Sequence, residues 1–535
     1  MAKSIEYDFV WDDKVLIGPS LDVRGPADLA RLWNTPFDSL LREPVIQQTY
    51  FRPLVLFSLA LDRSQGGRGA ETFHRTNLLL YALACVFLWL FAWEVSGRPV
   101  AATVGAVLFA VHPAHPESVV FISGRTDVLC GAFLFASLWA AARFGRHSRR
   151  AWTRLIPASA LLLLALYSKE VALFAAPLLP LVLWLRERRI KAAALTIATL
   201  PVLAAIVVYF ASRIGVVGHG LVPAASPVAG TIPQLLTSVA VAARYVPLLL
   251  FPISLSARHE VAPLARPDFV FVAGVLLLVA IAAGLFLTIR RRSMWSVPLF
   301  LFAATLLPLC SVRIIAGALV AERFLFIPSG ALAIAVALLP GTAALLASGT
   351  FAAFFLALLL PRVPIWKDGG TLYTSMLRDS PNSPYVHAIL GGYYYEQRNY
   401  RRAIEHHKRA FELNPEFKES LLNLGAAEEE SGQVDSAFTH VRLLLRLSPQ
   451  YAPAWYALGN LYARIDRPDS AASAYRSAVR LDPDLAQAEN NLGVVLERMG
   501  RFEEAAAHYE RALTLQPGYS DATNNLARLL SERAK

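Results

Sequence analysis

The sequence predicts an all-α protein, in which a polytopic membrane helical domain is followed by an α-solenoid of tetratricopeptide repeats. Hydrophobic residues make up 55% of the 535 residues and gather in long stretches before residue 361. That composition is too apolar for an ordinary soluble enzyme. Beyond this point prolines recur every 34 residues, which is the period of a tetratricopeptide repeat. These prolines are Pro381, Pro415, Pro449, Pro483 and Pro517.

Residues 1–72 are expected to form an external loop region. The first 20 residues have neither the pattern of a signal peptide nor a spanning helix. Residues 14–72 are polar, with proline and glycine, and include a short amphipathic run at 54–61 that suits the membrane interface. The region also carries a pair of adjacent acidic residues, Asp12 and Asp13.

Residues 73–361 are expected to form a multi-helix transmembrane domain. A spanning helix needs about 20 apolar residues, and we expect about ten such helices, some of them short or interrupted by proline. The segment 236–252 is interpreted as re-entrant or interfacial, because the loops on both of its sides are expected on the outer side. The candidate segments lie near 74–95, 99–113, 119–144, 153–168, 171–186, 192–212, 236–252, 268–290, 294–311, 324–340 and 341–361.

The basic residues predict an orientation. Residues 1–361 hold 30 Lys and Arg against 18 Asp and Glu, whereas residues 362–535 hold 21 against 22. This distribution argues against a nucleic acid partner and favours basic loops on the cytoplasmic side. The joints at 143–150, 186–191 and 290–292 are therefore expected to be cytoplasmic. Alternation then places residues 1–72 and the repeats outside, which requires a first membrane helix upstream of the given chain.

Residues 362–383 are expected to be a linker, followed by repeats at 384–417, 418–451, 452–485 and 486–519 and a capping helix. Small residues recur where paired helices approach closely. They are Gly391, Gly425, Gly459 and Gly493 at position 8, and Ala403, Ala437, Ala471 and Ala505 at position 20. At position 6, Asn423, Asn491 and Asn525 form a ladder that could hydrogen-bond an extended peptide. Ordinary solvated asparagine is the alternative.

Charged and polar residues gather at the expected outer face. Either Asp12 or Asp13 could take a proton from an incoming hydroxyl, and the alternative is an acidic helix end. His112, His115 and Glu117 fall within six residues. Such a cluster can bind metal, but the two intervening prolines prevent a regular helical face, which leaves hydrogen bonding to substrate or loop as the alternative.

Further charges lie at the ends of apolar helices. Arg125 and Asp127 could form a structural pair or contact a sugar or phosphate. The neighbours Lys169 and Glu170, and likewise Glu322 and Arg323, place a cation beside a carboxylate, an arrangement that suits a lipid-linked phosphate donor. Arg258, His259 and Glu260 are a weaker example, for which a solvated loop is the alternative. The three cysteines, Cys85, Cys130 and Cys310, are interpreted as packing residues.

Several short motifs together carry a resemblance to a known family. In order they are FVWDD at 9–13, YFRPL at 50–54, FHRTN at 73–77, FAVHPAHPESV at 109–119 running on to SGRTDVL, SKE at 168–170 and AERFLFIPS at 321–329. This ordered set resembles the transmembrane and tetratricopeptide-repeat O-mannosyltransferases. The family carries a membrane helix before the acidic pair, which the given chain lacks, and often more repeats.

The resemblance implies a membrane domain of the glycosyltransferase C type and transfer from a polyprenyl-phosphate sugar, typically dolichyl-phosphate mannose, to Ser/Thr hydroxyls of proteins. It implies that Asp12 or Asp13 is catalytic. It also implies that the donor and acceptor region is lined by His112, His115, Glu117, Arg125, Asp127, Lys169, Glu322 and Arg323.

The expected protein is thus an integral membrane glycosyltransferase that holds its protein acceptor by the repeats. We expect it to transfer mannose by an inverting reaction. No cofactor is assigned, and the need for a divalent metal stays open. The expected location is a bacterial inner membrane, with the repeats on the periplasmic side. Alternatives are a lipid-linked oligosaccharide ligase or polymerase, and a membrane-anchored repeat scaffold without activity.

Overall fold

A computed structural model of the protein describes residues 1–40, 50–66, 69–144, 153–187, 189–218, 230–310 and 320–533. These residues form α-helices, 3-10 helices and turns, and no strand occurs among them. The prediction of an all-α protein is confirmed. The chain divides into two units, Met1–Asp379 and Ser380–Lys535.

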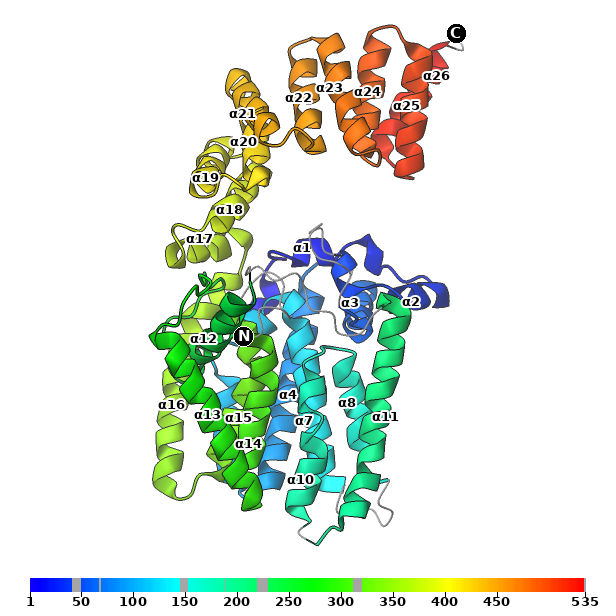
Figure 1. Ribbon diagram of the computed structural model, residues 1–535. Coiled ribbons are helices and arrows are strands. Elements are labelled where there is room, and N and C mark those ends of the chain that lie inside the picture. Colours follow the sequence, from blue (N-terminus) through cyan, green and yellow to red (C-terminus); the bar gives the residue numbers. More distant parts are fainter. Residues whose placement is uncertain are drawn as a thin grey trace. The chain divides into compact units, whose positions relative to one another are not determined.

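The beginning of the first unit consists of short helices. They are η1 (Ala2–Glu6), α1 (Asp13–Leu16), η2 (Pro19–Leu21), α2 (Pro26–Trp33), η3 (Phe37–Leu40) and α3 (Pro53–Gly66). Figure 1 shows α1, α2 and α3 at one end of the upright helices. Their apolar side chains share a core with Phe73 of the first long helix and with Ile122 and Leu129. The N-terminal segment is therefore packed onto the helical bundle.

Among the described residues from 69 to 362, eleven α-helices of nine or more residues make up the bundle and its surroundings. They are α4 (Glu71–Ser96), α5 (Pro99–Ala110), α7 (Arg125–Phe144), α8 (Ile156–Leu166), α10 (Leu178–Arg186), α11 (Ala192–Val217), α12 (Thr231–Leu250), α13 (Phe269–Arg290), α14 (Ser296–Leu306), α15 (Phe326–Leu338) and α16 (Thr342–Arg362). Shorter elements between them are α6 (Pro116–Val119), η4 (Ile122–Gly124), α9 (Ala172–Ala175), η6 (Leu307–Cys310) and η7 (Glu322–Leu325).

Six of the described helices are long and apolar enough to cross a membrane: α4, α7, α11, α12, α13 and α16. They indicate a multi-pass membrane protein. Several of the other expected spans fold as shorter apolar helices, among them α5, α8 and α14. Most of the expected re-entrant segment, residues 236–250, lies within α12, a continuous helix of 20 residues. Whether α12 crosses the membrane or lies at its surface stays a prediction.

Helix ends follow local signals in the sequence. Gly97 ends α4 and Gly218 ends α11, both with positive φ, a conformation that glycine adopts without steric strain. Asp268 precedes α13 and its side chain accepts a hydrogen bond from the Phe271 N–H at 2.8 Å, which satisfies one of the free amides at the start of the helix.

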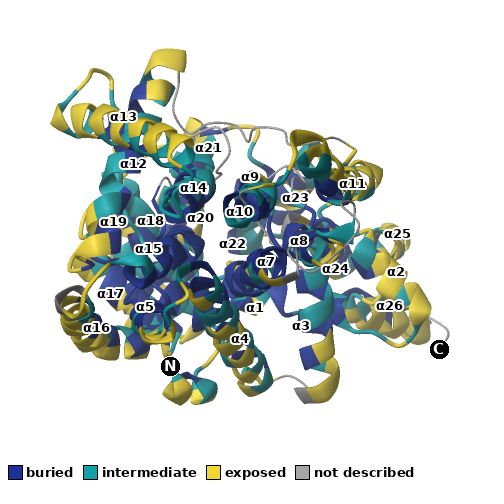
Figure 2. Ribbon diagram, turned by 90° about the horizontal axis from the view of Figure 1, so that it is seen from below, coloured by how far each residue is buried: buried dark blue, intermediate teal, exposed yellow. Residues whose placement is uncertain are grey.

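The helices differ in how far they are enclosed. Buried residues make up 89% of the apolar window around α7 but only 11% of that in α13. In Figure 2, α7 lies among other helices, whereas α11, α13 and α16 show exposed residues at the periphery. Charged side chains at the start of α7 therefore lie in a protein interior rather than against lipid.

The basic residues of the joints expected to be cytoplasmic contact neighbouring helices where the structure describes them. Arg186 binds Glu94 at 2.7 Å, and Arg143 lies 3.9 Å from the same carboxylate. Arg292 stacks over Trp184 at 4.3 Å. The remaining residues of the 143–150 joint, and most of the expected outer loop at 313–323, lie outside the described residues. In Figure 1 the C-terminal ends of α7, α10 and α13, where these joints begin, lie at the end of the bundle opposite to α1.

The first unit closes with η8 (Val363–Trp366) and α17 (Gly369–Asp379). The second unit consists of paired helices whose first members begin at residues 384, 418, 452 and 486. The helices are α18 (Pro384–Glu396), α19 (Tyr400–Leu413), α20 (Lys418–Glu430), α21 (Val434–Leu447), α22 (Ala452–Arg464), α23 (Pro468–Leu481), α24 (Ala486–Arg498), α25 (Phe502–Leu515) and α26 (Ser520–Arg533).

Glycine is needed at position 8 of the repeats for a steric reason. A Cβ on any of these four glycines would lie 2.5 to 2.8 Å from a side-chain atom of the paired helix, which is closer than carbon atoms pack. The facing residues recur at the repeat interval and are His407, Val441, Tyr475 and Tyr509. Glycine therefore lets each helix pair approach closely.

Candidate active site

The acidic pair begins α1, and its two members have different surroundings. Asp13 is fully buried. Its Oδ1 accepts hydrogen bonds from the amide and hydroxyl of Ser123, both at 2.7 Å. Its Oδ2 accepts from the amides of Ile122 at 3.2 Å and Val10 at 3.5 Å. Asp12 is partly exposed. The structure thus separates a carboxylate that holds the turn from one that solvent can reach.

The pKa of Asp13, taken alone, would suggest Asp13 as the general base. Burial raises the pKa of Asp13 to about 7, although its four hydrogen bonds act to lower it. A carboxylate that titrates near neutral pH is a suitable general base, but a base must first reach the proton that it removes. Both oxygens of Asp13 already accept hydrogen bonds inside the protein. The geometry therefore favours Asp12.

Arg323 and Glu117 form the next part of the site. The Glu117 carboxylate, which is fully buried, binds both the guanidinium of Arg323 and its backbone amide, the latter at 2.9 Å. Burial acts to lower the pKa of Arg323, but Glu117 and Asp127 outweigh it and the pKa is raised. Asp12 acts in the same direction. The exposed fraction of the Arg323 side chain is 29%, so an anion can reach this cation from solvent.

Gly124 allows this arrangement. A Cβ at residue 124 would lie 2.5 Å from the carbonyl oxygen of Glu117 and 2.7 Å from that of Ser118. Only glycine permits such close contact between η4 and α6. This contact brings Glu117 beside Ser123, which holds Asp13.

Lys169 pairs with Asp127 inside the protein, with 2.6 Å between Nζ and Oδ1. Burial lowers the pKa of Lys169, and the charge of Asp127 opposes that shift. Arg52 and Arg323 also act on Lys169. The cations at 52, 169 and 323 therefore belong to one electrostatic cluster.

Two arginines of this cluster were missed from the sequence. Glu170 binds Arg52 at 3.0 Å and Arg213 at 3.5 Å. Arg52 also stacks over Tyr50 at 4.3 Å. Arg213 lies inside the apolar helix α11, and a charge within such a helix is expensive unless it is paired or functional. That signal was available in the sequence, but its partner could not be identified before the fold was known.

The sequence left two alternatives for Arg125, a structural pair with Asp127 or a contact with sugar or phosphate, and the structure gives Arg125 other partners. Arg125 instead binds Asp62 at 2.5 Å and Asn77 at 2.6 Å, and it donates to the Phe73 carbonyl at 2.8 Å. Its side chain is fully buried. A guanidinium has five N–H donors, and these partners come from α3 and α4. Arg125 therefore joins helices, and its charge is used inside the protein.

The two histidines are also interior. The Ala114 amide donates to Nδ1 of His112 at 3.2 Å, which leaves Nε2–H to donate to the Leu249 carbonyl at 3.0 Å. His115 lies 2.9 Å from both the Tyr81 hydroxyl and the Ser329 hydroxyl. All four ring nitrogens thus have partners, which favours hydrogen bonding within the protein over contact with a substrate. Within the described ranges, no group of three or more His, Cys, Asp or Glu could hold a metal ion.

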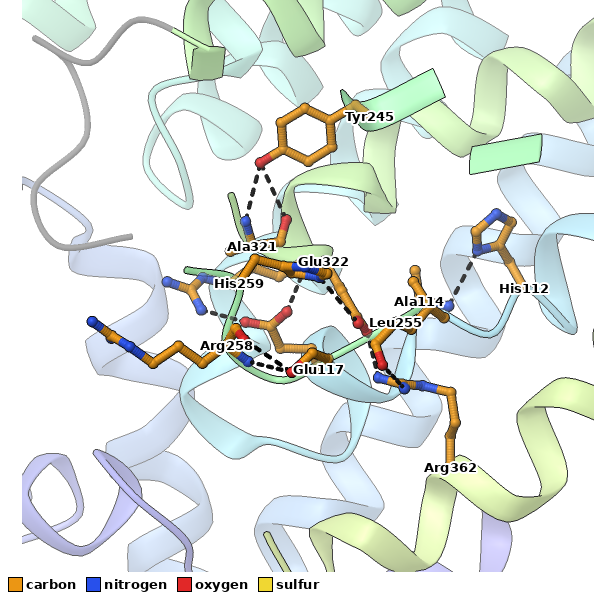
Figure 3. A network of polar contacts seen from close by, with 12 residues as sticks. His112, Ala114, Glu117, Tyr245, Leu255, Arg258, His259, Ala321, Glu322 and Arg362 are labelled. Carbon is orange, nitrogen blue, oxygen red and sulfur yellow. Dashed lines mark hydrogen bonds and ion pairs between the residues drawn. The ribbon is translucent and has the colours of Figure 1, made fainter. Parts of the chain in front are cut away.

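Glu322 has partners other than Glu117 and Arg323, and Figure 3 shows it with Arg362 and His259 in a network that also includes Glu117. Its Oε2 binds Arg362 at 2.6 Å, and its Oε1 lies 3.6 Å from Nε2 of His259. Arg362 also donates to the Leu255 carbonyl at 2.9 Å. Burial raises the pKa of Glu322, against the opposing effect of Arg362. Adjacent residues 322 and 323 therefore serve different purposes, and Arg258 pairs separately with Glu260 at 2.9 Å.

In the repeat unit, two of the three ladder asparagines belong to a polar network. Asn491 donates to the Tyr456 hydroxyl at 3.1 Å and to Asn460 at 3.2 Å. Asn525 donates to Asn490 at 3.0 Å. Asn423 is exposed and separate from these hydrogen bonds. The ladder is thus connected at its C-terminal end, and the sequence did not predict the parts of Tyr456 and Asn460.

The residues around Asp12 and Arg323 can support acid–base catalysis beside an anion-binding group. Asp12 supplies an accessible carboxylate, and Arg323 and Lys169 supply cations in partly desolvated surroundings. Cations in such surroundings bind phosphate more strongly than they do in water. This combination suits the transfer of a group from a phosphate ester.

Comparison with known proteins gives a family match, similar solved structures and similar curated proteins. The chain matches the tetratricopeptide repeat family over residues 390–452 and 456–529, which confirms the predicted repeats. Among solved structures, the crystal structure of MamA protein aligns at 24% identity with a TM-score of 0.26, over 29% of this chain and 84% of that chain.

The curated relatives are enzymes by name. Protein O-mannosyl-transferase Tmtc1 of Drosophila melanogaster is 34% identical over 175 residues, which cover 31% of this chain and 19% of that protein. Protein O-mannosyl-transferase TMTC4 of Homo sapiens is 32% identical over 164 residues, 28% of this chain and 22% of that protein. The chain spans about a fifth of the length of these relatives. It is thus related to the transmembrane and tetratricopeptide-repeat protein O-mannosyl-transferases, as its motifs predict.

Proposed function

We propose that the protein is a membrane glycosyltransferase that moves mannose from a polyprenyl-phosphate donor to Ser/Thr hydroxyls of a protein acceptor. The observation that carries this proposal is the partly exposed Asp12, whose charge acts on the partly exposed Arg323, in a chain related to protein O-mannosyl-transferases. The sugar, the lipid donor and the acceptor are all part of the proposal.

In the proposed reaction, the acceptor hydroxyl oxygen attacks the anomeric carbon of the donor sugar. Asp12 accepts the hydroxyl proton, and the bond between the anomeric carbon and the phosphate oxygen breaks. The lipid phosphate leaves with the bonding electron pair and gains negative charge. Arg323 and Lys169 would neutralise that charge, an effect that lowers the barrier because these cations are already in place.

Arg52 and Arg213 are proposed to support the same phosphate. In the free protein they share one carboxylate, Glu170, whose contact with Arg213 is the longer at 3.5 Å. A guanidinium has five N–H donors, so Arg52 and Arg213 could donate to a phosphate that enters the cluster as well as to Glu170.

Substitution of the acidic residues tests the base. We expect Asp12→Asn to lower transfer from radiolabelled polyprenyl-phosphate mannose to protein by about 10²- to 10⁴-fold, the usual contribution of a general base. Asp8→Asn is the matched control, because Asp8 is an exposed acid in the same segment and should keep wild-type activity. Asp13→Asn should mainly lower the yield of folded protein, because it disturbs the buried hydrogen bonds to Ser123.

The outcomes separate the parts of the proposal. Full transfer by Asp12→Asn would show that Asp12 is not the base. No protein-bound label with the wild-type chain would reject the donor class. A product heavier than one hexose would instead favour a lipid-linked oligosaccharide ligase or polymerase.

The repeats are proposed to hold the acceptor through the asparagine ladder. Asn491 lies within a network of amides and hydroxyls, and such groups suit an extended peptide backbone. Asn491→Ala should raise the KM for the acceptor and leave hydrolysis of the donor unchanged. Thr514→Ala is a suitable control, because its hydroxyl only donates to the Glu510 carbonyl of its own helix. Equal KM values for the two variants would contradict the proposal.

The proposed location of the repeats on the outer side of a bacterial inner membrane has its own test. A single cysteine at Ser473→Cys, in α23, should react with a membrane-impermeant maleimide from the periplasmic side. Arg291→Cys, after α13, should react only from the cytoplasmic side. Both native residues are exposed. The opposite pattern would reverse the orientation.

A further inference from the structure

The turn that carries Asp12 begins with an unusual backbone conformation. Trp11 has φ +50°, in the left-handed region. Such a conformation disfavours a bulky residue by roughly 1–2 kcal/mol. Within the described part of the chain, three other residues besides glycines have positive φ, and they follow helix ends: Arg292, Arg398 and Asp466. Trp11 instead precedes a helix and lies next to the proposed base, a position where strained backbone often serves function.

Three aromatic rings hold this turn. Trp11 stacks on Phe121, with 5.9 Å between ring centroids and 27° between planes. Phe121 stacks in turn on Trp366, at 5.5 Å and 29°. Trp366 and Phe121 are buried, with 1% and 3% of their surfaces exposed. Offset aromatic pairs contribute about 0.5–1.5 kcal/mol each beyond their burial. We refer to Trp11, Phe121 and Trp366 as the aromatic stack.

Two residues of the aromatic stack are neighbours in the chain of the groups that form the hydrogen bonds of Asp13. Trp11 directly precedes the acidic pair. Phe121 directly precedes Ile122 and Ser123, whose amides donate to Asp13. Movement of Phe121 would therefore shift the donors and the acceptor together. A second contact joins the same segments, because the Asp8 amide donates to the Lys367 carbonyl at 3.1 Å.

We infer that Trp366 is a positioning residue for Asp12 and acts through Phe121 and Trp11. The inference rests on the proposed function for its catalytic consequence. Trp366 ends η8, the element that follows the last membrane helix α16 and precedes α17. The covalent path to the repeats begins at the same residue. A change in η8 would reach the turn of Asp12 through the stacked rings, beside the backbone hydrogen bond between Asp8 and Lys367.

Substitution of Trp366 tests this role. Trp366→Ala should lower kcat for transfer on the order of 10- to 100-fold, because small displacements of a catalytic group have effects of that size. The KM for the donor should stay within about twofold, since Trp366 is not placed in the phosphate cluster. Trp366→Phe keeps an aromatic ring and should recover most of the kcat. Trp93→Ala is the control, because Trp93 is 41% exposed on α4.

A second measurement does not depend on activity. The amides of Val15, Leu16 and Ile17 donate to the carbonyls of Asp12 and Asp13. Their hydrogen exchange in the full chain should be faster in Trp366→Ala and near wild type in Trp366→Phe. Phe121→Leu, which removes the middle ring but keeps an apolar side chain, should show the same acceleration. If Trp366→Ala does not fold, Phe121→Leu replaces it in both measurements.

The inference would be overturned if the amides of residues 15–17 exchanged at the wild-type rate in a folded variant that lacks one of the three rings. Equal loss of kcat in Trp366→Ala and Trp366→Phe would also overturn it, because that result would indicate loss of volume rather than of stacking. If the wild-type chain transfers no sugar, the proposed function fails. The exchange result would still decide whether the aromatic stack orders the turn.

Discussion

The two units of the protein use polar groups in opposite ways. In the repeat unit, charged pairs join neighbouring repeats and are partly exposed, as between Arg498 and Asp466 or Arg528 and Glu497. In the membrane unit, the pairs Arg125–Asp62 and Lys169–Asp127 are buried and join elements far apart in the sequence. Repeat proteins interact mainly with their neighbours, so the first pattern is periodic. The second pattern depends on the complete bundle.

The largest expected effect comes from a buried pair of the membrane unit. Arg125→Met leaves the Asp62 carboxylate buried without its cation, and such a change typically costs about 3–5 kcal/mol. Thermal unfolding of the detergent-solubilised chain should show a much lower midpoint. Arg143→Met, at the other end of α7, removes an arginine that is 54% exposed and should have little effect.

A double variant sharpens this test. Asp62→Leu together with Arg125→Met removes both charges and should recover part of the lost stability, because apolar replacements of buried ion pairs are often tolerated. If Arg125→Met alone were as stable as Arg143→Met, Arg125 would not be the structural residue that its contacts indicate. It would then return to consideration as a substrate contact.

The contrast between the units explains what the sequence could predict. The repeats were predictable because Gly425 and Val441, for example, face each other at a fixed spacing of 16 residues. The charged residues of the membrane unit were recognised as unusual because charges in apolar surroundings are rare. Their partners were not predictable. Arg125 and Asp127 are two residues apart on one helix, yet each binds a residue of another element.

Asp12 and Asp13 show the same limit more sharply. They are neighbours of identical chemistry, so the sequence offered no basis for a choice between them. The choice depends on Ser123, which follows Asp13 by 110 residues and donates two hydrogen bonds to it. Similarly, Arg52, which directly precedes α3, and Arg213 of α11 both contact one carboxylate, Glu170, only in the folded protein.

The next effect in size concerns a buried histidine of the repeat unit. His407 is 1% exposed, and its two ring nitrogens have no hydrogen-bond partner among the described residues. Burial lowers its pKa from 6.5 to about 4. The folded unit thus favours the neutral ring, and stability is lost as the pH falls from about 6.5 to about 4. The loss is about 2 kcal/mol at pH 5, since each unit of pKa shift corresponds to about 1.4 kcal/mol.

The measurement is hydrogen exchange of α18 and α19 at pH 7 and pH 5, corrected for the intrinsic exchange rate. His407→Tyr should remove much of the pH dependence. Tyr475 and Tyr509 occupy the equivalent positions in later repeats and face Gly459 and Gly493, so a tyrosine ring suits this site. Unchanged pH dependence in that variant would assign the effect to another group, of which His387 and His406 are the nearest alternatives.

The smallest effect is expected for an exposed ion pair of the same unit. Arg409 and Glu412 lie 3.2 Å apart on α19, and each side chain is nearly half exposed, at 46% and 47%. Their separation resembles that of Lys169 and Asp127, so distance alone would predict similar energies. Exposure decides the difference, because water and salt screen the pair and both side chains lose freedom when they meet. Arg409→Ala should therefore change the stability of α19 by no more than about 0.5 kcal/mol, and 1 M salt should abolish even that difference. A loss of several kcal/mol, measured by the same exchange experiment, would show that the repeats too depend on individual charged pairs, and the contrast between the two units would not hold.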